Sequence, residues 1–357
     1  MIVHLVCGAR PNIPKIAPIY KALQNYPSIN PVIVHTGQHY DKNLYWDTAD
    51  MFGLVAPNMK ALNLDVCSGS GNARMAKMMT RYETILAGGF HKRPDLVIVV
   101  GDVDSTRAAA MTAAKLDIPV AHVEAGLRSY DMRMPEELNR IIADNLSTLR
   151  FTSMPSATEV LKDCAGVYEV GNVMIDAIQM TEHLWRRENN FIVPFVLVTV
   201  HRPSNVDDEE RASAVAQKLR QISEKIPLIF PVHPRSTILK RKLENAPNIR
   251  LVEPLVYNEF MTYLHECAFV ITDSGGLQEE SLYFNKTCLV LRENTERPET
   301  LRINGGTGFL VKQLGLLDTM VPWAMKSKLP SMLPKYWDGK AADRICAIIN
   351  KFLTEGK

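Results

Sequence analysis

The apolar positions of the chain fall into short continuous runs, and longer stretches with helical spacing separate them. In the first half the runs occupy residues 2–7, 31–37, 96–102, 119–126 and 149–153, and the helical patterns occupy 13–25, 72–87, 105–116 and 136–146. Runs that are apolar at consecutive positions and rich in β-branched residues indicate strands covered on both faces. The first half therefore predicts a parallel sheet between two layers of helices.

The same alternation restarts after residues 170–178. New apolar runs occupy 195–201, 227–233, 249–255, 268–273 and 287–292, and helical patterns occupy 208–225, 236–245, 258–266 and 276–284. The predicted fold class is α/β, with two Rossmann-like, doubly wound domains. We expect an N-terminal domain at 1–168, a C-terminal domain at 169–338, and an amphipathic helix at 339–357 that packs back toward the first domain.

Polar side chains gather where the predicted strands end. They are Arg10, His39, Asp102, Glu124, His201, His233, Asp273 and Arg292. Ligands of open parallel sheets bind at the carboxyl ends of the strands. We therefore expect the two domains to face each other across a ligand-binding cleft; the alternative is two independent domains on a flexible tether.

Composition narrows the class of partner. The chain has 357 residues and a formal net charge of +2, so no broad field for nucleic acid is indicated. Its 6 cysteines are scattered without C-x-x-C spacing, which favours buried free thiols in a reducing cytoplasm. The first residues predict a strand and not a signal peptide. No apolar stretch approaches the roughly 20 residues that span a bilayer, so we expect no membrane partner.

The segment "ITDSGGLQEES" (271–281) joins a predicted strand to a predicted helix. Ser274, Gly275 and Gly276 would leave backbone N–H groups open to phosphate oxygens, and Glu280 could accept hydrogen bonds from a ribose diol. The alternatives are a tight turn with a helix cap, and a solvated glutamate. The first predicted strand ends in "GARPNIPK" (8–15), which lacks the G-x-G-x-x-G of dinucleotide sites.

Charged residues at the other strand ends suggest chemistry. Arg10 and Lys15, near a helix N-terminus, suit an anion such as a diphosphate, or are ordinary surface cations. Asp102, Glu124 and Glu136 suggest one pocket for proton donors and acceptors, although Glu136 also suits the first turn of a helix. His122 with these acids lacks metal-ligand spacing, so no metal is predicted.

Two histidines occupy equivalent positions in the second half. His201 and His233 each follow a predicted strand, and a pair placed in this way is more suggestive of ligand contacts than a lone histidine. The segment "RENTERPET" (292–300) carries Arg292 and Arg297. It is either a solvated loop with surface ion pairs or a phosphate- or sugar-binding loop.

Taken in order, these segments resemble the non-hydrolysing UDP-N-acetylglucosamine 2-epimerases. The resemblance rests on "GARPN..K", "TGQHYD", "GDVDST", "HVEAGLRS", "MPEELNR", "VTVHRPSNVD", "PVHPRS", "EPL.Y..F", "DSGGLQEE" and "NTERPE", and it covers nearly the whole chain. It implies a GT-B-type arrangement, a homodimer, no cofactor, and inversion at C2 of UDP-GlcNAc to give UDP-ManNAc. The family mechanism eliminates UDP to a 2-acetamidoglucal and then adds it back.

The resemblance also implies roles for particular residues. Asp102, Glu124 and Glu136 become the acid/base carboxylates, and His201 contacts the diphosphate or assists its departure. The residues that match substrate-binding positions are Arg10, Lys15, His233, Leu255, Phe260, Ser274, Gly275, Gly276, Glu280 and Arg297. Among these, Phe260 matches the aromatic residue against uracil, with Leu255 nearby, and Glu280 matches the ribose acceptor.

Departures from the family pattern leave the sugar open. Ala9 and Asn12 replace a threonine and a glutamate found in many members, and "HRPSN" replaces "HRREN". The chain thereby resembles a subgroup that includes epimerases of modified UDP-sugars such as diacetamido-uronic acids. Residues 65–72 depart from members with an activator site, although Gln38 and His39 are kept. More remote alternatives are a hydrolysing epimerase, a GT-B glycosyltransferase and a nucleotide-sugar sensor without turnover.

Overall fold

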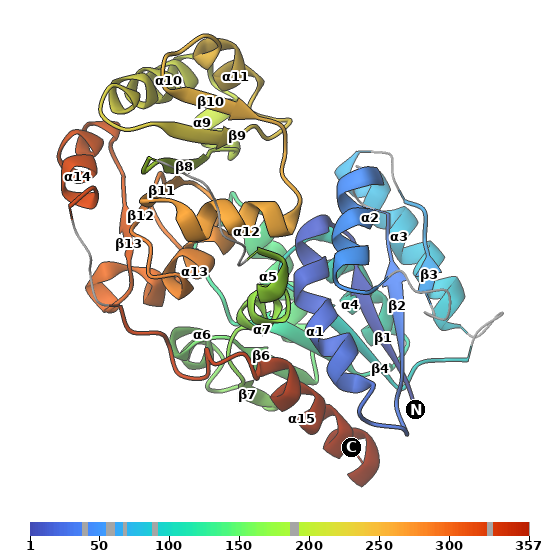
Figure 1. The fold of residues 1–357 in the computed structure, drawn as a ribbon. Helices are drawn as coiled ribbons and strands as arrows, with labels where there is room; N and C mark the ends of the chain where they lie inside the picture. Colours follow the sequence, from blue (N-terminus) through green and yellow to red (C-terminus); the bar gives the residue numbers. More distant parts are fainter. Residues whose placement is uncertain are drawn as a thin grey trace. The chain divides into compact units, whose positions relative to one another are not determined.

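The computed structural model describes residues 1–37, 42–54, 61–66, 70–87, 92–185, 193–326 and 331–356, with the backbone alone at 42–46. The chain forms two compact units (Figure 1). Unit 1 consists of Met1–Thr181 and Pro334–Lys357, and unit 2 consists of Glu182–Leu333. The sequence places its domain boundaries at 168/169 and 338/339, whereas the compact units divide at 181/182 and 333/334.

Unit 1 is built on a parallel sheet whose strand order is β3-β2-β1-β4-β5-β6-β7. The order reverses between β1 and β4, as in a doubly wound fold. The strands are β1 (Ile2–Cys7), β2 (Asn30–His35), β3 (Ala61–Asn63), β4 (Leu96–Val100), β5 (Val120–Ala125), β6 (Leu149–Thr152) and β7 (Val167–Glu169). The short strands β3 and β7 extend the sheet beyond the strands predicted from the sequence.

Helices cover both faces of this sheet (Figure 1). One layer contains α3 (Gly71–Leu86), α4 (Asp104–Lys115) and α5 (Pro135–Leu146), and the other contains α1 (Ile13–Leu23), α7 (Val173–Met180) and α15 (Ala341–Glu355). The remaining helices of the unit are η1 (Arg10–Asn12), α2 (Lys42–Met51) and α6 (Pro155–Val160). The buried face of α4 is rich in alanine, so α4 packs closely beside α3 and α5.

Unit 2 repeats the plan with strand order β10-β9-β8-β11-β12-β13. The strands are β8 (Val196–Thr199), β9 (Leu228–Pro231), β10 (Ile249–Val252), β11 (Phe269–Thr272), β12 (Cys288–Val290) and β13 (Gly308–Leu310). The larger helices are α10 (Glu209–Ser223), α11 (Thr237–Leu243), α12 (Tyr257–Glu266), α13 (Gly276–Tyr283) and α14 (Leu317–Ala324). Shorter helices are α8 (Glu182–Trp185), α9 (Pro203–Val206), and the 3-10 turns η2 (Pro298–Thr300), η3 (Arg302–Asn304) and η4 (Leu314–Leu316).

Both strand orders correspond to the doubly wound order 3-2-1-4-5-6, so the predicted α/β fold class is confirmed. Two details of the second sheet differ from the prediction. Strand β10 ends at Val252, short of the predicted residue 255, because Pro254 has no N–H for the ladder. Strand β13 was not predicted, and it adds a short edge beside β12.

The C-terminal helix α15 belongs to unit 1, where it packs on α1 and α7. Asp176 of α7 accepts hydrogen bonds from Ala341 N at 3.2 Å and Ala342 N at 2.8 Å, the first N–H groups of α15. Trp337 Nε1 donates to Ser153 O at 2.7 Å just before the helix. The Asp176 side chain therefore caps the N-terminus of α15, which lies far from α7 in the sequence.

The state of the cysteines and the character of the helices were both predicted from the sequence. Every described cysteine is free; Cys7, Cys267, Cys288 and Cys346 are buried, whereas Cys164 is exposed, so the prediction of burial is wrong for Cys164. Cys67 lies outside the described residues. None of the described helices combines the length and the apolar character that crossing a bilayer requires.

Candidate active site

Several predicted site residues lie at the carboxyl ends of strands, some of them at the points where the strand order reverses. In unit 1, Lys15 follows β1, Asp102 follows β4 and Glu124 lies in β5. In unit 2, His201 follows β8 and Ser274 follows β11. Each unit thus carries some of the predicted site residues at the carboxyl ends of its strands, the position expected for a ligand. That the two halves face each other across a cleft stays a prediction.

Glu124 has an unusual backbone conformation for a residue in a strand. Its φ is +64°, in the left-handed region, and the register with β6 shifts between Val123 and Ala125. Such a bulge re-aims a side chain, and a non-glycine residue is held there only by its surroundings. The carboxylate is buried, with the residue 3% exposed, and Oε2 forms an ion pair with Lys15 Nζ.

Gly101 forms the turn between β4 and Asp102. Its φ is +65°, and a Cβ at this position would lie 3.0 Å from Lys15 Nζ and 3.1 Å from Glu124 Oε2. A glycine is therefore required for both its backbone and the space beside the ion pair. Asp102 directly follows Gly101, the residue that borders the Lys15–Glu124 pair.

Helix α5 holds Asp102 from the other side. Arg140 Nη2 forms an ion pair with Asp102 Oδ2, and Asn139 Nδ2 donates to Asp102 O at 2.9 Å. Arg140 is itself 2% exposed and its Nη1 donates to Glu137 Oε2 at 2.9 Å. Glu136, in the first turn of the same helix, is half-buried and has no hydrogen-bond or ion-pair partner within the described ranges.

Glu137 is a site residue that the sequence did not single out. Its carboxylate accepts from Ser129 N at 2.8 Å, Ser129 Oγ at 2.9 Å and Tyr130 N at 3.0 Å. It thereby ties the loop after β5 to Arg140 and so to Asp102. The i,i+3 spacing of Glu137 and Arg140 on one helix was the available signal.

The buried His122 contacts both the Gly101 turn and Asp144. Its Nε2 lies 2.9 Å from Gly101 O, and its Nδ1 lies 2.7 Å from Asp144 Oδ1. Burial by itself would raise the pKa of Asp144, but His122 and Arg128 lower it below its ordinary value. Within the described ranges no group of three His, Cys, Asp or Glu side chains is gathered as metal ligands would be.

Arg10 lies in η1 and is exposed. The turn that presents it is ordered by Asn12, whose Oδ1 accepts from Gly8 N at 3.1 Å and Ala9 N at 3.0 Å. Asn12 therefore caps the loop after β1. His39 and Gln38, which belong to the next strand end, lie outside the described residues.

In unit 2, His201 and His233 lie together at the ends of the adjacent strands β8 and β9. Their ring centroids are 5.1 Å apart, and His201 Nδ1 lies 3.3 Å from Asp273 Oδ1. Burial lowers the pKa of His201, Arg202 and Arg235 lower it further, and Asp273 opposes them. His233 is exposed, and its Nδ1 accepts from Arg235 N at 3.1 Å.

The Ser274–Gly276 turn lies beside Arg297 and Glu296. A Cβ on Gly275 would lie 2.6 Å from both Arg297 Nη1 and Glu296 Oε1, whereas a Cβ on Gly276 would have no neighbour within 4 Å. The first glycine is thus enclosed by protein, and the second opens onto free space at the start of α13. A tight turn alone does not require open space beside its second glycine.

The segment 292–300 is not a solvated loop, so that alternative is wrong. Arg292 is 8% exposed and Arg297 is 5% exposed. Glu296 forms one ion pair with Arg297 Nη1 and another with Arg292 Nη2, the latter at 2.7 Å. Arg297 Nε also lies 3.0 Å from Glu279 Oε1. The buried guanidinium groups are held rigidly against the turn.

Three further residues lie at the start of α12 and within α13. Leu255 and Phe260 are half-buried, and Glu280 is 8% exposed, so Glu280 is not a solvated helix residue. Burial raises the pKa of the Tyr257 hydroxyl, and the neighbouring charge of Glu280 raises it further. Tyr257 is part of the quoted pattern "EPL.Y..F", which gave it no role, and it lies in the same helix as Phe260.

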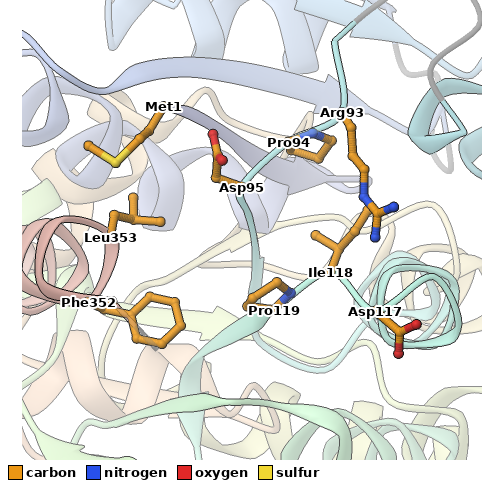
Figure 2. Close-up of a pocket in the computed structure, with 10 residues that line it drawn as sticks. Met1, Arg93, Pro94, Asp95, Asp117, Ile118, Pro119, Phe352 and Leu353 are labelled. Carbon is orange, nitrogen blue, oxygen red and sulfur yellow. The ribbon is translucent and has the colours of Figure 1, made fainter.

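A separate cavity of about 430 Å³ lies at the opposite edge of the sheet of unit 1 (Figure 2). Met1, Asp95 and Pro119 line it from the segments that precede β1, β4 and β5, and Phe352 and Leu353 line it from α15. None of the predicted site residues lines this cavity. It lies at the amino ends of the strands, where ligands of this fold do not bind.

Comparison with known proteins supplies a family. The family model described as UDP-N-acetylglucosamine 2-epimerase matches residues 21–350. A Methanocaldococcus jannaschii protein named UDP-N-acetylglucosamine 2-epimerase is 35% identical, with 100% of each chain covered. A Pseudomonas aeruginosa protein named UDP-2,3-diacetamido-2,3-dideoxy-D-glucuronate 2-epimerase is 32% identical over 98% of this chain and 100% of its own.

A solved structure agrees with both the sequence match and the fold. The crystal structure of Methanocaldococcus jannaschii UDP-GlcNAc 2-epimerase in complex with UDP-GlcNAc and UDP is 33% identical, with a TM-score of 0.89. It covers 98% of this chain, which in turn covers 99% of that structure. The resemblance read from the motifs is thereby confirmed.

Proposed function

Because the chain belongs to the UDP-N-acetylglucosamine 2-epimerase family and is an isomerase of that type, we propose that it interconverts UDP-GlcNAc and UDP-ManNAc by inversion at C2. The observation that carries this proposal is the cluster in unit 1. There, the buried Glu124 is paired with Lys15 and adjoins the turn that leads into Asp102.

Unit 2 supplies the features that bind a nucleotide diphosphate. The open space beside Gly276, the N-terminus of α13 and the buried Arg297 together favour phosphate oxygens. The buried carboxylate of Glu280 suits a ribose diol. Phe260 supplies an aromatic face for uracil, with Leu255 nearby. The Methanocaldococcus jannaschii relative holds UDP-GlcNAc and UDP, which agrees with this assignment.

Unit 1 supplies groups that can move a proton at C2. The C2 proton is weakly acidic, so its removal must be coupled to departure of UDP from C1. Carboxylates must act on both faces of C2, and the candidates in this unit are Asp102 after β4, Glu124 in β5 and Glu136 in the first turn of α5. Arg10 and Lys15 supply positive charge on the same side of the sheet.

The proposed reaction is an anti elimination followed by re-addition. One carboxylate removes the C2 proton while UDP leaves C1, with His201 assisting the diphosphate, and the product is a 2-acetamidoglucal. Protonation of C2 on the opposite face and return of UDP to C1 give the epimer. Atoms balance because UDP and one proton leave and return, so the reaction needs no redox cofactor.

A second candidate substrate is a modified UDP-sugar such as UDP-2,3-diacetamido-glucuronic acid. The identity to the Pseudomonas aeruginosa epimerase is close to that of the UDP-GlcNAc relatives and covers almost the whole of both chains. The segment "HRPSN" at His201 points the same way. The chemistry at C2 would be the same, and the difference would lie at C3 and C6 of the sugar.

The test is to incubate the purified protein with UDP-GlcNAc in D₂O and to follow it by proton NMR. Formation of UDP-ManNAc with deuterium at C2 supports the proposal. Free ManNAc with UDP would indicate a hydrolysing enzyme. No change with UDP-GlcNAc, followed by turnover of the diacetamido-uronic substrate, would favour the second candidate. No turnover of either substrate would favour a sensor, and transfer to an added acceptor would favour a glycosyltransferase.

A further inference from the structure

We propose that Asp273 is a positioning residue for catalysis: its buried carboxylate holds the imidazole of His201 with the proton on Nδ1, so that Nε2 is the nitrogen presented to the leaving diphosphate. The inference rests on the proposed function in assigning the diphosphate to His201.

Asp273 is 0% exposed and lies directly after β11, next to the Ser274 turn. Its Oδ1 accepts from His201 N at 3.0 Å, and its Oδ2 accepts from Arg202 N at 2.9 Å and Asn205 Nδ2 at 3.0 Å. One carboxylate therefore fixes the backbone of the loop after β8. Since β8 and β11 are the two strands that flank the reversal point, this link fixes the geometry of the site itself.

The same carboxylate fixes the His201 ring. Nδ1 lies 3.3 Å from Asp273 Oδ1. An ionised carboxylate can only accept, so this contact places the proton on Nδ1. In the neutral ring Nε2 then carries the lone pair, and in the protonated ring Nε2–H becomes the donor that points away from Asp273.

Exposure separates the two partners. The side chain of His201 keeps 36% of its surface exposed, whereas that of Asp273 keeps 0%. The carboxylate is therefore shielded from solvent, whereas the imidazole remains accessible. A buried carboxylate in this arrangement stabilises the imidazolium that forms when the ring takes up a proton, and it preserves the ring orientation.

The other charged groups around His201 make the carboxylate necessary. Arg202 lies on the same loop, and Arg235 and His233 follow β9. Burial and the two arginines lower the pKa of His201, and Asp273 is the group that raises it. Without Asp273, His201 would hold a proton less readily, and a proton on Nε2 is what assistance to the diphosphate requires.

The experiment is NMR of the ring nitrogens in the full chain labelled with ¹⁵N-histidine. In the wild-type protein above its titration midpoint, we expect the proton of His201 on Nδ1. This measurement needs no variant and no turnover, so a failure of the proposed function leaves it intact. A wild-type proton on Nε2 would overturn the inference.

The variant Asp273→Asn tests the charge. We expect the titration midpoint of His201 to fall by about one pH unit, and kcat to fall on the order of 10²-fold with a smaller change in KM. The basic limb of the kcat profile moves to lower pH with the midpoint. An unchanged midpoint in a folded variant would overturn the inference.

Two controls separate positioning from general loosening. Asn205→Ala removes a hydrogen bond to Asp273 and leaves the carboxylate beside His201, so we expect the wild-type proton position. Asp318→Asn removes an exposed partner of Lys218, so we expect a wild-type titration and wild-type kcat.

Discussion

Gly101 and Glu124 lie side by side at the ends of adjacent strands, and both have left-handed backbone conformations, with φ of +65° and +64°. Gly101 N donates to Val123 O at 3.0 Å, so the backbone of Gly101 is hydrogen-bonded to the residue just before Glu124. The glycine leaves the space that the Glu124 carboxylate and Lys15 occupy. A strained acidic residue is thus supported by a neighbour that has no side chain.

Gly101→Ala should lower both stability and turnover. The left-handed backbone costs an L-residue about 1–2 kcal/mol, and the added methyl group displaces the Lys15–Glu124 pair. Gly53→Ala is the matched control, because Gly53 has φ of +68° but only Lys21 atoms at 3.9 Å. Urea unfolding should show a similar loss in both variants, and only Gly101→Ala should lose turnover. Equal activity of the two variants would contradict the crowding at Glu124.

Glu124→Gln and Asp102→Asn should each abolish turnover and largely preserve UDP binding. Both amides keep the size of the side chain and remove its capacity to take up a proton at C2. Calorimetry with UDP and the D₂O assay measure the two properties separately. Glu159→Gln, an exposed change on α6, should behave as wild type. Full activity in both site variants would refute the assignment of the carboxylates.

The two glycines of the Ser274 turn should respond differently to alanine. Gly275→Ala drives a methyl group against Arg297 and Glu296, so the free energy of unfolding without ligand should fall by about 1–3 kcal/mol. Gly276→Ala should leave stability unchanged or slightly higher, since alanine suits a helix better than glycine, but it should weaken UDP binding at least about tenfold, or roughly 1.4 kcal/mol. Wild-type UDP affinity in Gly276→Ala would mean that the turn is only a turn.

Asp176 should give the stability of the protein a pH dependence. Burial raises its pKa from 3.8 to about 6, and the N–H groups of Ala342 and Ala341 oppose this. A raised carboxyl pKa favours the folded state when protonated, so this contribution is complete below pH 3.8 and is lost as pH rises through about 6. The loss amounts to about 3 kcal/mol.

The measurement compares urea unfolding of wild type and Asp176→Asn between pH 4 and pH 7. Because the variant lacks the titrating group, its stability relative to wild type should rise across this range. Asp163→Asn, an exposed change, should show no such trend. A difference between wild type and Asp176→Asn that does not vary with pH would count against a titrating Asp176.

Periodicity and turn chemistry were enough to predict the two sheets and the strand ends at which the candidate site residues lie. Apolar runs such as 96–102 mark strands buried on both faces, whatever their partners are. The conformation of Glu124 could not be predicted, because it depends on the register between β5 and β6. Lys15 and Glu124 are 109 residues apart in the sequence, so no local sequence pattern predicts that they pair.

Glu137 and Arg140 were missed for a related reason. Their roles depend on burial, and a sequence shows charge without showing which charges are enclosed. Arg292 and Arg297 show the same limit, since the sequence left open whether their charged segment is a solvated loop, and both side chains are buried. The short edge strands β3, β7 and β13 are set by neighbouring strands more than by their own residues.

The return of the chain to unit 1 has a consequence for biosynthesis. Helix α15 packs on α1 and α7 but is translated after all of unit 2. While the ribosome makes residues 182–333, the apolar surfaces of α1 and α7 that receive α15 are still uncovered, and Asp176 has no helix to cap. A nascent unit 1 is therefore incomplete until residues 341–355 have been made, and until then it exposes apolar surface that the folded protein covers.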